Sequence, residues 1–297
     1  MADKNILHMV TPLKHMSPFD VNMALDAGYD AVLPYASVTV DEITGLVQDA
    51  IFSRPPKAGA HTALFIGGRN ATLALDMLDK ARKALVPPFG ISFFADPSGS
   101  FTTAAAMVAC VEKALKDKKQ RDLSGLKTAV FGATGVVGFC AAIIAALEGA
   151  AVTLVGYDGI KRVADAAAQI KARFNAHVDA ADGSDDGKKA DILKDAEAVL
   201  AAGRAGVQIL TRAQVAEAKN LLIAADVNAV PPAGIEGLAA NANGDVLAGD
   251  ALGIGALAIG GIKYKTEFGL FKKMIEAAKP VTLDFRDAFA LARELNG

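Results

Sequence analysis

Short apolar runs alternate with amphipathic segments along the first third of the chain. The runs are mostly apolar, as expected of buried parallel strands, whereas the segments between them carry apolar residues at helical spacing. The predicted strands are 6–10, 31–34, 62–66 and 91–94, and the predicted helices are 21–27, 40–51 and 71–85. This alternation predicts a parallel sheet with helices on both faces.

The pattern restarts after a charged segment. A helix predicted over 102–115 leads into Lys116-Asp-Lys-Lys-Gln-Arg-Asp122, which we expect to be a flexible surface crossing between two domains. Strands are predicted beyond it at 127–132, 151–155, 177–180, 198–202 and 221–225, separated by helices at 135–148 and 160–174 and by a polar segment at 181–189. Five such strands opened by a glycine-rich turn predict a doubly wound Rossmann domain.

The tail of the chain, residues 263–296, again shows a helical pattern. Pro280 interrupts the pattern, and we expect the tail to fold back onto the first domain. The sequence therefore predicts an α/β protein of two domains, the first formed by residues 1–122 and 266–297 and the second, of Rossmann type, by residues 123–265.

Composition narrows the class of protein. The 297 residues are 52% hydrophobic and 22% charged, and 31 Lys and Arg against 33 Asp and Glu give a net charge of −2. A near-neutral chain argues against nucleic acid as the main partner, because nucleic-acid-binding surfaces are strongly basic. Cys110 and Cys140 lie inside apolar runs and make no metal-ligand spacing with the four histidines. We therefore expect buried free thiols, a reducing cytoplasm and no metal.

One stretch, residues 129–147, has no charged side chain and is nearly as long and apolar as a transmembrane helix. Its glycines follow a short β-type run and precede an Ala- and Ile-rich helical pattern, so a strand, a turn and a helix account for it. The N-terminal residues carry charges where a signal peptide would be continuously apolar. We predict neither secretion nor a membrane partner.

The turn inside this stretch is a candidate nucleotide site. Gly132-Ala-Thr134-Gly135-Val136-Val137-Gly138 stands between a predicted strand and a predicted helix, the context that the dinucleotide fingerprint requires. Gly135 would admit a pyrophosphate, Gly138 would let helix and strand pack closely, and N–H groups at the helix start would bind the anion. Ala133 occupies the first fingerprint glycine position, with Gly132 one residue earlier. Plain helix–sheet packing is the alternative role of these glycines.

An acidic residue follows the second strand of this domain. Asp158 would accept hydrogen bonds from the adenosine ribose, which favours NAD, whereas Lys161 and Arg162 would balance the 2′-phosphate of NADP, so both cofactors stay open. Asp158 is equally suited to be the N-cap of the helix that starts near residue 160. Tyr157 and Lys161 also match the Tyr-x-x-x-Lys string of short-chain dehydrogenases, but at a place which that family does not use.

Five further segments carry a resemblance. They are His15-Met-Ser-Pro-Phe19-Asp20-Val-Asn, Phe65-Ile-Gly-Gly68, Asp96-Pro-Ser-Gly99-Ser-Phe-Thr102-Thr103-Ala-Ala, Asp226-Val-Asn228-Ala-Val-Pro231-Pro232-Ala-Gly234 and Ala251-Leu-Gly-Ile-Gly-Ala-Leu-Ala-Ile-Gly-Gly-Ile-Lys263. In this order, over nearly the whole chain, they resemble the methylene-tetrahydromethanopterin dehydrogenases of methylotrophic bacteria. The chain is more similar to the branch that uses NAD or NADP than to the strictly NADP-dependent branch, which carries Gly-Arg in place of Gly156-Tyr157.

The resemblance implies a reversible hydride transfer from the methylene bridge of the pterin to the nicotinamide, which leaves a methenyl cation. It also implies that residues 1–122 and 266–297 form the catalytic, pterin-binding domain, that the two substrates meet between the domains, and that the protein is a homo-oligomer, a trimer or a multiple of one. Two nitrogens flank the reacting carbon and delocalise its charge, so orientation and electrostatics carry the rate and no general base is required.

The same resemblance suggests site residues. Asp20 would stabilise the cation and Phe19 would stack on the pterin or its aryl ring, although Asp20 is also a good helix N-cap. Lys263 would hold the polar edge of the pterin, whereas Lys265 fits a surface lysine. The other expected substrate residues are Asp96, Ser100, Thr102 and Thr103, of which the threonines are equally suited to cap a helix, and the nicotinamide is expected near Gly203 and Asn228.

Two alternatives follow from the same residues. A methylene-tetrahydrofolate dehydrogenase would perform the same chemistry on a similar substrate, but the Tyr-x-x-x-Lys that its cyclohydrolase step uses is missing after Tyr29 and Tyr35. A non-catalytic NAD-binding sensor would keep the Rossmann domain alone. The presence of both Asp20 and Lys263 argues against the sensor.

Overall fold

The computed structural model describes residues 4–297, and the chain divides into two compact units. Unit 1 comprises Met1–Thr102 and Tyr264–Leu291, and unit 2 comprises Thr103–Lys263 and Ala292–Gly297. The chain passes between the units inside three helices, α4 (Ser100–Lys119), α9 (Ala256–Glu276) and α10 (Phe285–Asn296). The sequence analysis placed the domain bounds at 122 and 265, whereas the two units meet inside helices that continue without interruption.

Unit 1 contains a five-stranded parallel sheet in the order β12-β4-β3-β1-β2. Its strands are β1 (Ile6–Val10), β2 (Ala31–Tyr35), β3 (Thr62–Ile66), β4 (Ser92–Ala95) and β12 (Thr282–Leu283). Its helices are α1 (Pro18–Ala27), α2 (Ile43–Phe52), α3 (Ala71–Lys83) and the short 3₁₀ turns η1 (Pro56–His61) and η2 (Pro97–Gly99). The predicted alternation is confirmed, and the tail does return to this sheet through β12.

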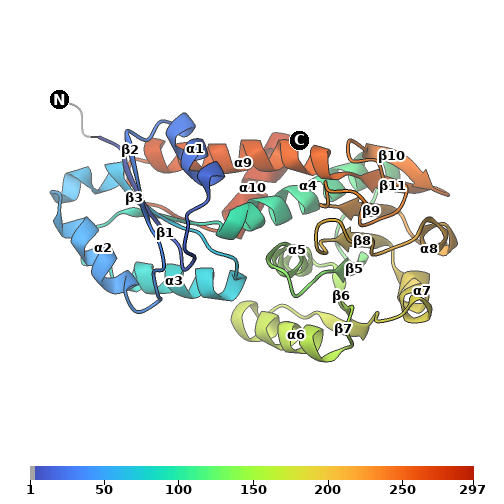
Figure 1. Cartoon of the computed structure of the whole chain (residues 1–297). Coiled ribbons are helices and arrows are strands. Elements are labelled where there is room, and N and C mark those ends of the chain that lie inside the picture. Colours follow the sequence, from blue (N-terminus) through green and yellow to red (C-terminus); the bar gives the residue numbers. More distant parts are fainter. Residues whose placement is uncertain (1–3) are drawn as a thin grey trace. The chain divides into compact units, whose positions relative to one another are not determined.

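Helices cover both faces of this sheet, with α1 and the end of α9 on one face and α2 and α3 on the other (Figure 1). An aromatic cluster joins α9 to the sheet: the ring of Phe271 lies 5.5 Å from that of Phe65 and 5.3 Å from that of Phe94. Tyr29 packs edge-on against the same Phe271. Burying each such side chain contributes about 1.5–3 kcal/mol, so this contact fixes where α9 crosses the unit.

Unit 2 contains a seven-stranded sheet in the order β10-β11-β9-β8-β5-β6-β7, parallel except for β10. The strands are β5 (Lys127–Phe131), β6 (Ala151–Gly156), β7 (Asp179–Asp182), β8 (Ala198–Ala201), β9 (Ile223–Asp226), β10 (Asn243–Ala248) and β11 (Ala251–Ile254). The helices are α5 (Val136–Leu147), α6 (Lys161–Phe174), α7 (Asp186–Asp195), α8 (Arg212–Glu217) and α10 (Phe285–Asn296), whose last turn belongs to this unit. The strand order reverses at β5, which is the switch point of a Rossmann domain.

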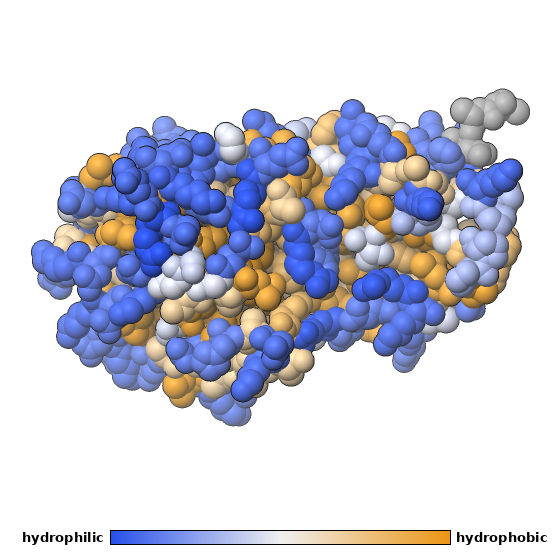
Figure 2. Space-filling model, turned by 180° about the vertical axis from the view of Figure 1, so that it is seen from behind, coloured by the Kyte–Doolittle hydropathy of each residue, from blue (hydrophilic) through white to orange (hydrophobic). Residues whose placement is uncertain are grey.

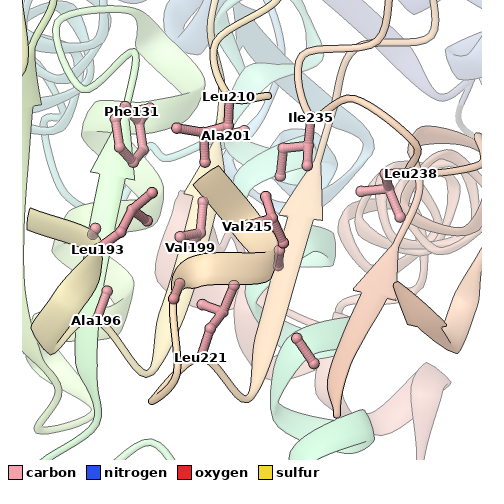
Figure 3. Close-up of a cluster of buried hydrophobic side chains, with 14 of the residues drawn as sticks. Phe131, Leu193, Ala196, Val199, Ala201, Leu210, Val215, Leu221, Ile235 and Leu238 are labelled. Carbon is pink, nitrogen blue, oxygen red and sulfur yellow. The ribbon is translucent and has the colours of Figure 1, made fainter. Parts of the chain in front are cut away.

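Alternate residues of the central strands face a second core beneath α7 and α8. Figure 3 shows Phe131, Val199 and Ala201 pointing toward the same side as Leu193 and Val215. The opposite face packs against α5 and α6 (Figure 1). The strands are therefore buried on both faces, which explains why residues 129–147 read as one continuous apolar stretch although they form β5, a turn and α5.

Three elements depart from the sequence-based predictions. The charged segment 116–122 is not a flexible crossing, because α4 continues to Lys119 with an ion pair between Lys116 and Glu112 one turn apart. The polar segment 181–189 contains the start of α7, whose N-cap Asp185 accepts a hydrogen bond from the N–H of Lys188. The antiparallel hairpin β10–β11 was not predicted, since its strands are short and interrupted by glycines.

The surface view in Figure 2 shows hydrophilic residues over much of the face, with apolar residues interspersed among them. Both cysteines are buried and free, as predicted. None of the helices formed by residues 4–297 has the length and apolar character needed to cross a membrane.

Candidate functional site

The glycine turn after β5 is shaped by contacts that exclude side chains. Gly132 has a φ of +77°, and a Cβ on it would lie 2.3 Å from the carbonyl oxygen of Ala202. A Cβ on Gly138 would lie 2.5 Å from the carbonyl oxygen of Gly132. Gly132 thus makes the tight turn in place of Ala133, and Gly138 allows the close approach of helix and strand that the sequence analysis expected.

Gly135 has a different role in the same turn. It is the N-cap of α5, without a side-chain cap, and the nearest atom to a Cβ placed on it lies 3.2 Å away. The first turn of α5, with Val136 and Val137, therefore presents backbone N–H groups at an open surface, and the helix dipole adds positive potential there. This geometry fits the pyrophosphate of a dinucleotide.

A pocket of about 570 Å³ opens at this turn, wholly within unit 2. It lies at the carboxyl ends of β5, β6 and β8, where open α/β sheets bind ligands. Four predicted residues line it, namely Gly132, Thr134, Gly135 and Gly203. The sequence analysis did not assign the other lining residues to the nucleotide site; these are Phe131, Val155, Tyr157, Gly183, Lys189, Ala202, Arg204, Val207, Gln208 and Ile209. Tyr157, Gly183 and Ala202 directly follow β6, β7 and β8, and this position was the signal that could have found them.

Arg162, at the start of α6, joins three other side chains on the surface of unit 2. Arg162 Nη1 donates to Asp158 Oδ2 and to Tyr157 Oη, each at 3.1 Å, and Arg162 Nη2 donates to Thr134 Oγ1 at 3.4 Å. The hydrogen bond to the Asp158 carboxylate, followed by that to Tyr157, raises the pKa of Arg162. Asp158 is not the N-cap that the sequence analysis considered, because α6 begins at Lys161 with Ile160 as its cap. The Lys161 side chain is exposed.

Asn228 ties two loops of unit 2 together. Its Oδ1 accepts hydrogen bonds from the N–H groups of Gly206 and Val230, and its Nδ2 donates to the carbonyl oxygen of Pro232. Beneath it the buried carboxylate of Asp226 accepts from the N–H of Asn228 at 2.9 Å. Both residues line a second cavity of about 210 Å³. Asn228 therefore holds the loops after β8 and β9 in register at the carboxyl edge of the sheet.

Asp20 and Phe19 lie in the first turn of α1. Ser17 is the N-cap of this helix, so Asp20 is not the cap, and its residue surface is only 2% exposed. Phe19 is 46% exposed, and its ring lies 6.5 Å from that of Tyr264 in α9. A buried acid thus stands beside an exposed aromatic ring, both at the start of one helix.

Asp96 and Thr102 are bound to each other. Thr102 Oγ1 donates to Asp96 Oδ2 at 2.6 Å, and Asp96 Oδ1 accepts from the backbone N–H of Phe101 at 2.8 Å. Both are fully buried, whereas Ser100 and Thr103 beside them are partly exposed. Asp96 therefore caps the start of α4, and of the four substrate residues predicted between Asp96 and Thr103 only Ser100 and Thr103 are partly exposed.

The loop between Asp96 and α4 is also constrained. Ser98 adopts a φ of +55°, which L-residues rarely occupy, and its hydroxyl donates to the carbonyl oxygen of Gly68 at 2.6 Å. The loops after β3 and β4 are thereby joined at the carboxyl edge of the unit 1 sheet. A strained residue at this edge is typical of a ligand site.

Lys263 lies within α9, which starts seven residues earlier, and its side chain is partly buried, whereas Lys265 is exposed as predicted. One turn further along the same helix, Glu267 is fully buried. The sequence analysis missed Glu267, whose signal was a carboxylate four residues after Lys263 on the same face of a helix. Fully buried acids are uncommon in proteins, which makes Glu267 a candidate site residue.

These features define the class of protein. The strand order, the glycine turn and the adjoining pocket give unit 2 the Rossmann architecture of nucleotide-dependent dehydrogenases. Solved structures share the fold: an NAD-dependent malic enzyme from Thermotoga maritima aligns over 97% of this chain and 84% of its own with a TM-score of 0.59 at 12% identity. Shikimate 5-dehydrogenase from Listeria monocytogenes, solved with shikimate and NAD, aligns over 91% and 92% with a TM-score of 0.51 at 16% identity.

Sequence comparisons identify the family. The family described as "Methylene-tetrahydromethanopterin dehydrogenase, N-terminal" matches residues 18–98. The "NAD(P)-dependent methylenetetrahydromethanopterin dehydrogenase" of Methylorubrum extorquens is 54% identical over 99% of both chains. The "Bifunctional protein MdtA" of the same organism is 35% identical over 94% of both chains. The chain belongs to the methylene-tetrahydromethanopterin dehydrogenase family.

Proposed function

We propose that this protein catalyses reversible hydride transfer from methylene-tetrahydromethanopterin to NAD⁺ or NADP⁺, giving methenyl-tetrahydromethanopterin in the oxidation of one-carbon units. The observation that carries the proposal is the 54% identity, over 99% of both chains, to a relative named for this activity. The nucleotide-sized pocket at the glycine turn supports it independently.

The proposed reaction requires stabilisation of the positive charge that develops on the pterin and does not require a proton transfer. Bound NAD(P)⁺ supplies a hydride acceptor at C4 of its nicotinamide ring. The pterin carbon becomes cationic as the hydride leaves, and a carboxylate shielded from water stabilises that charge far better than an exposed one. We assign this role to Asp20, because it is buried at the start of α1 while its neighbour Phe19 is exposed for stacking.

The remaining predicted residues divide into binding and positioning groups. We assign pterin binding to Phe19, Ser100, Thr103 and Lys263, which are at least partly accessible. Asp96 and Thr102 act as positioning residues, since their mutual hydrogen bond fixes the start of α4. Phe19 and Ser100 belong to unit 1, whereas Thr103 and Lys263 are the first and last residues of the main segment of unit 2 and follow or precede unit 1 directly within α4 and α9. We propose unit 1 as the main pterin-binding unit, as the sequence analysis expected of residues 1–122 and 266–297.

In unit 2 we assign pyrophosphate binding to the turn from Gly132 to Gly138, including Thr134, Val136 and Val137. Gly203 lines the same pocket, and Asn228 positions the loop expected near the nicotinamide. Asp158, Lys161 and Arg162 are assigned to the adenosine ribose. Resemblance to the family further suggests a cytoplasmic homo-oligomer, a trimer or a multiple of one, which sedimentation of the purified protein would measure.

The test is a steady-state assay of reduced-nicotinamide absorbance with four substrate pairs: methylene-tetrahydromethanopterin or methylene-tetrahydrofolate, each with NAD⁺ or NADP⁺. Turnover with the methanopterin substrate and little with folate is expected. Absence of turnover from all four pairs, with nucleotide binding intact, would overturn the substrate assignment and leave only the Rossmann unit.

A further inference from the structure

The adenosine end of the proposed nucleotide site contains both a carboxylate, that of Asp158, and a guanidinium, that of Arg162. Asp158 follows β6 directly, where an acid accepts hydrogen bonds from a ribose 2′-hydroxyl, yet Arg162 one helical turn later is bound to it at 3.1 Å. An acid alone repels a 2′-phosphate, and a lone arginine favours one. Because Asp158 and Arg162 are bound to each other, the ligand depends on the carboxylate oxygen and the N–H donors that this pairing leaves unused.

The Asp158–Arg162 pair leaves some of its hydrogen-bonding groups unused. A guanidinium has five N–H donors, and Arg162 uses three of them, on Asp158 Oδ2, Tyr157 Oη and Thr134 Oγ1. Two N–H groups, one on Nε and one on Nη2, are left for a phosphate. Asp158 Oδ1 receives no hydrogen bond from residues 4–297 and is left for a hydroxyl. Arg162 also neutralises the charge on Asp158 that would repel a phosphate.

Tyr157 determines where the Arg162 guanidinium lies. The Tyr157 hydroxyl accepts from Nη1, and Arg162 Cζ stands 5.7 Å from the centre of the Tyr157 ring. The turn under Tyr157 requires glycine at position 156, because a Cβ there would lie 2.0 Å from the carbonyl oxygen of Gly159. Tyr157 also lines the nucleotide pocket, whereas the Asp158–Arg162 pair by itself is half-exposed and weakly held.

We propose that Tyr157 is a specificity-determining positioning residue, which holds Arg162 against Asp158 so that one ribose site accepts either a 2′-hydroxyl or a 2′-phosphate. Asp158 Oδ1 receives the hydroxyl of NAD⁺, and the two remaining N–H groups of Arg162 receive the phosphate of NADP⁺. This inference rests on the proposed function for its choice of ligand, because it assumes that the pocket of unit 2 binds a dinucleotide.

The experiment measures nucleotide binding by the full chain without any pterin, by isothermal titration calorimetry with NAD⁺, NADP⁺ and 2′,5′-ADP. Arg162→Met is expected to weaken NADP⁺ and 2′,5′-ADP about tenfold or more and to leave NAD⁺ within about twofold, since only the phosphate uses the guanidinium. Tyr157→Phe keeps the ring and removes the hydroxyl, so it should weaken the same two ligands by a smaller factor. Asp158→Asn should weaken NAD⁺ alone.

Lys171→Met is the matched control. It removes a positive charge from the exposed side of the same helix, α6, about 13 Å along the axis from Arg162, and should change none of the three affinities. Equal effects of Arg162→Met on NAD⁺ and NADP⁺, or unchanged NADP⁺ binding in Tyr157→Phe, would overturn the inference. A wild-type protein that binds neither nucleotide would instead overturn the proposed function, and the inference with it.

Discussion

Asp20 lies in the first turn of α1 with only 2% of its residue surface exposed. The sequence allowed two roles for Asp20, a helix N-cap and a functional acid, because an acid before an apolar helical pattern suits both. Ser17 takes the capping role in the structure, and Asp20 keeps a buried position that stability alone does not require. We therefore propose this buried carboxylate as the group that stabilises the cation of the proposed reaction.

Replacing Asp20 tests this role. Asp20→Asn keeps the shape and removes the charge, so kcat with methylene-tetrahydromethanopterin is expected to fall by about 10²–10³, while NAD⁺ binding stays unchanged. Asp26→Asn, on the exposed side of the same helix, is the control and should retain full activity. Thermal unfolding of both variants shows whether the fold is intact. Full activity in Asp20→Asn would remove this residue from the mechanism.

The buried carboxyl group of Asp226 leads to a prediction about how stability depends on pH. Burial raises the pKa of its carboxyl above 3.8, against hydrogen bonds from backbone N–H groups that lower it. A raised folded-state pKa means that the folded protein binds the proton more tightly. Its contribution to the free energy of unfolding is therefore largest below pH 3.8 and declines as pH rises through the folded-state pKa.

A ¹³C NMR titration of the aspartate carboxyl carbons checks this. We expect a midpoint above 3.8 for Asp226, whereas the hydrogen bond from Lys188, with further ones from Ser184, lowers the pKa of the exposed Asp182 to about 2. A midpoint for Asp226 at or below that of Asp182 would show that backbone hydrogen bonding outweighs burial.

At the scale of elements, the strands that are buried on both faces were the easiest to predict. β1 and β3 begin and end at the predicted residues, because short runs with four apolar residues out of five are typical of strands buried in a parallel sheet. Short or polar elements were missed. β10, β12 and α7 owe their conformation to neighbouring strands or to a single cap, and their own sequences carry little periodicity.

In the strand–turn–helix element around β5, we expect alanine at Gly138 to lower stability and alanine at Gly135 to lower nucleotide affinity. Gly138→Ala would place a Cβ 2.5 Å from the carbonyl oxygen of Gly132, so α5 must shift, and the free energy of unfolding should fall by about 1–3 kcal/mol. Gly135→Ala meets its nearest atom at 3.2 Å and should cost less stability, but its methyl group stands where the pyrophosphate approaches. NAD⁺ affinity should therefore fall about tenfold or more.

Gly45→Ala is the control for both variants. Gly45 lies inside α2, and no atom lies within 4 Å of a Cβ placed on it, so alanine should raise stability by up to about 1 kcal/mol and leave nucleotide binding unchanged. Urea unfolding and calorimetry measure the two quantities. Stability losses of equal size in Gly135→Ala and Gly138→Ala would contradict the separate roles assigned to them.

At the scale of the whole molecule, the two units are interleaved in sequence. The final segment serves both: β12 pairs with β4 and Phe285 packs against Phe101 in unit 1, while Arg293 binds Glu112 in unit 2 with Nε–Oε2 at 2.6 Å. Arg293 also binds Glu148 after α5. The C-terminal helix α10 is therefore a structural part of both units.

Ending the chain after Lys279 tests this interleaving. The truncation removes buried Leu283, Phe285 and Phe289, each worth about 1.5–3 kcal/mol, from a protein whose whole stability is of the order of 5–15 kcal/mol. It also leaves Glu112, which is 6% exposed, without Arg293. We expect no cooperative unfolding transition by circular dichroism. A chain that lacks only Gly297 should unfold like the full one, and a folded truncated chain would refute the shared role of α10.

The sequence by itself determined the α/β class, the Rossmann unit, the glycine turn and the family resemblance. These depend on local rules: strand and helix periodicity, and the need for glycine where a turn or an anion comes close to the backbone. Only the tertiary structure decided which acids are buried, since Asp20, Asp96 and Glu267 lose their water through residues distant in sequence. It also decided that Arg162 reaches Thr134, 28 residues away, because strand order and helix packing, not local pattern, bring such side chains together.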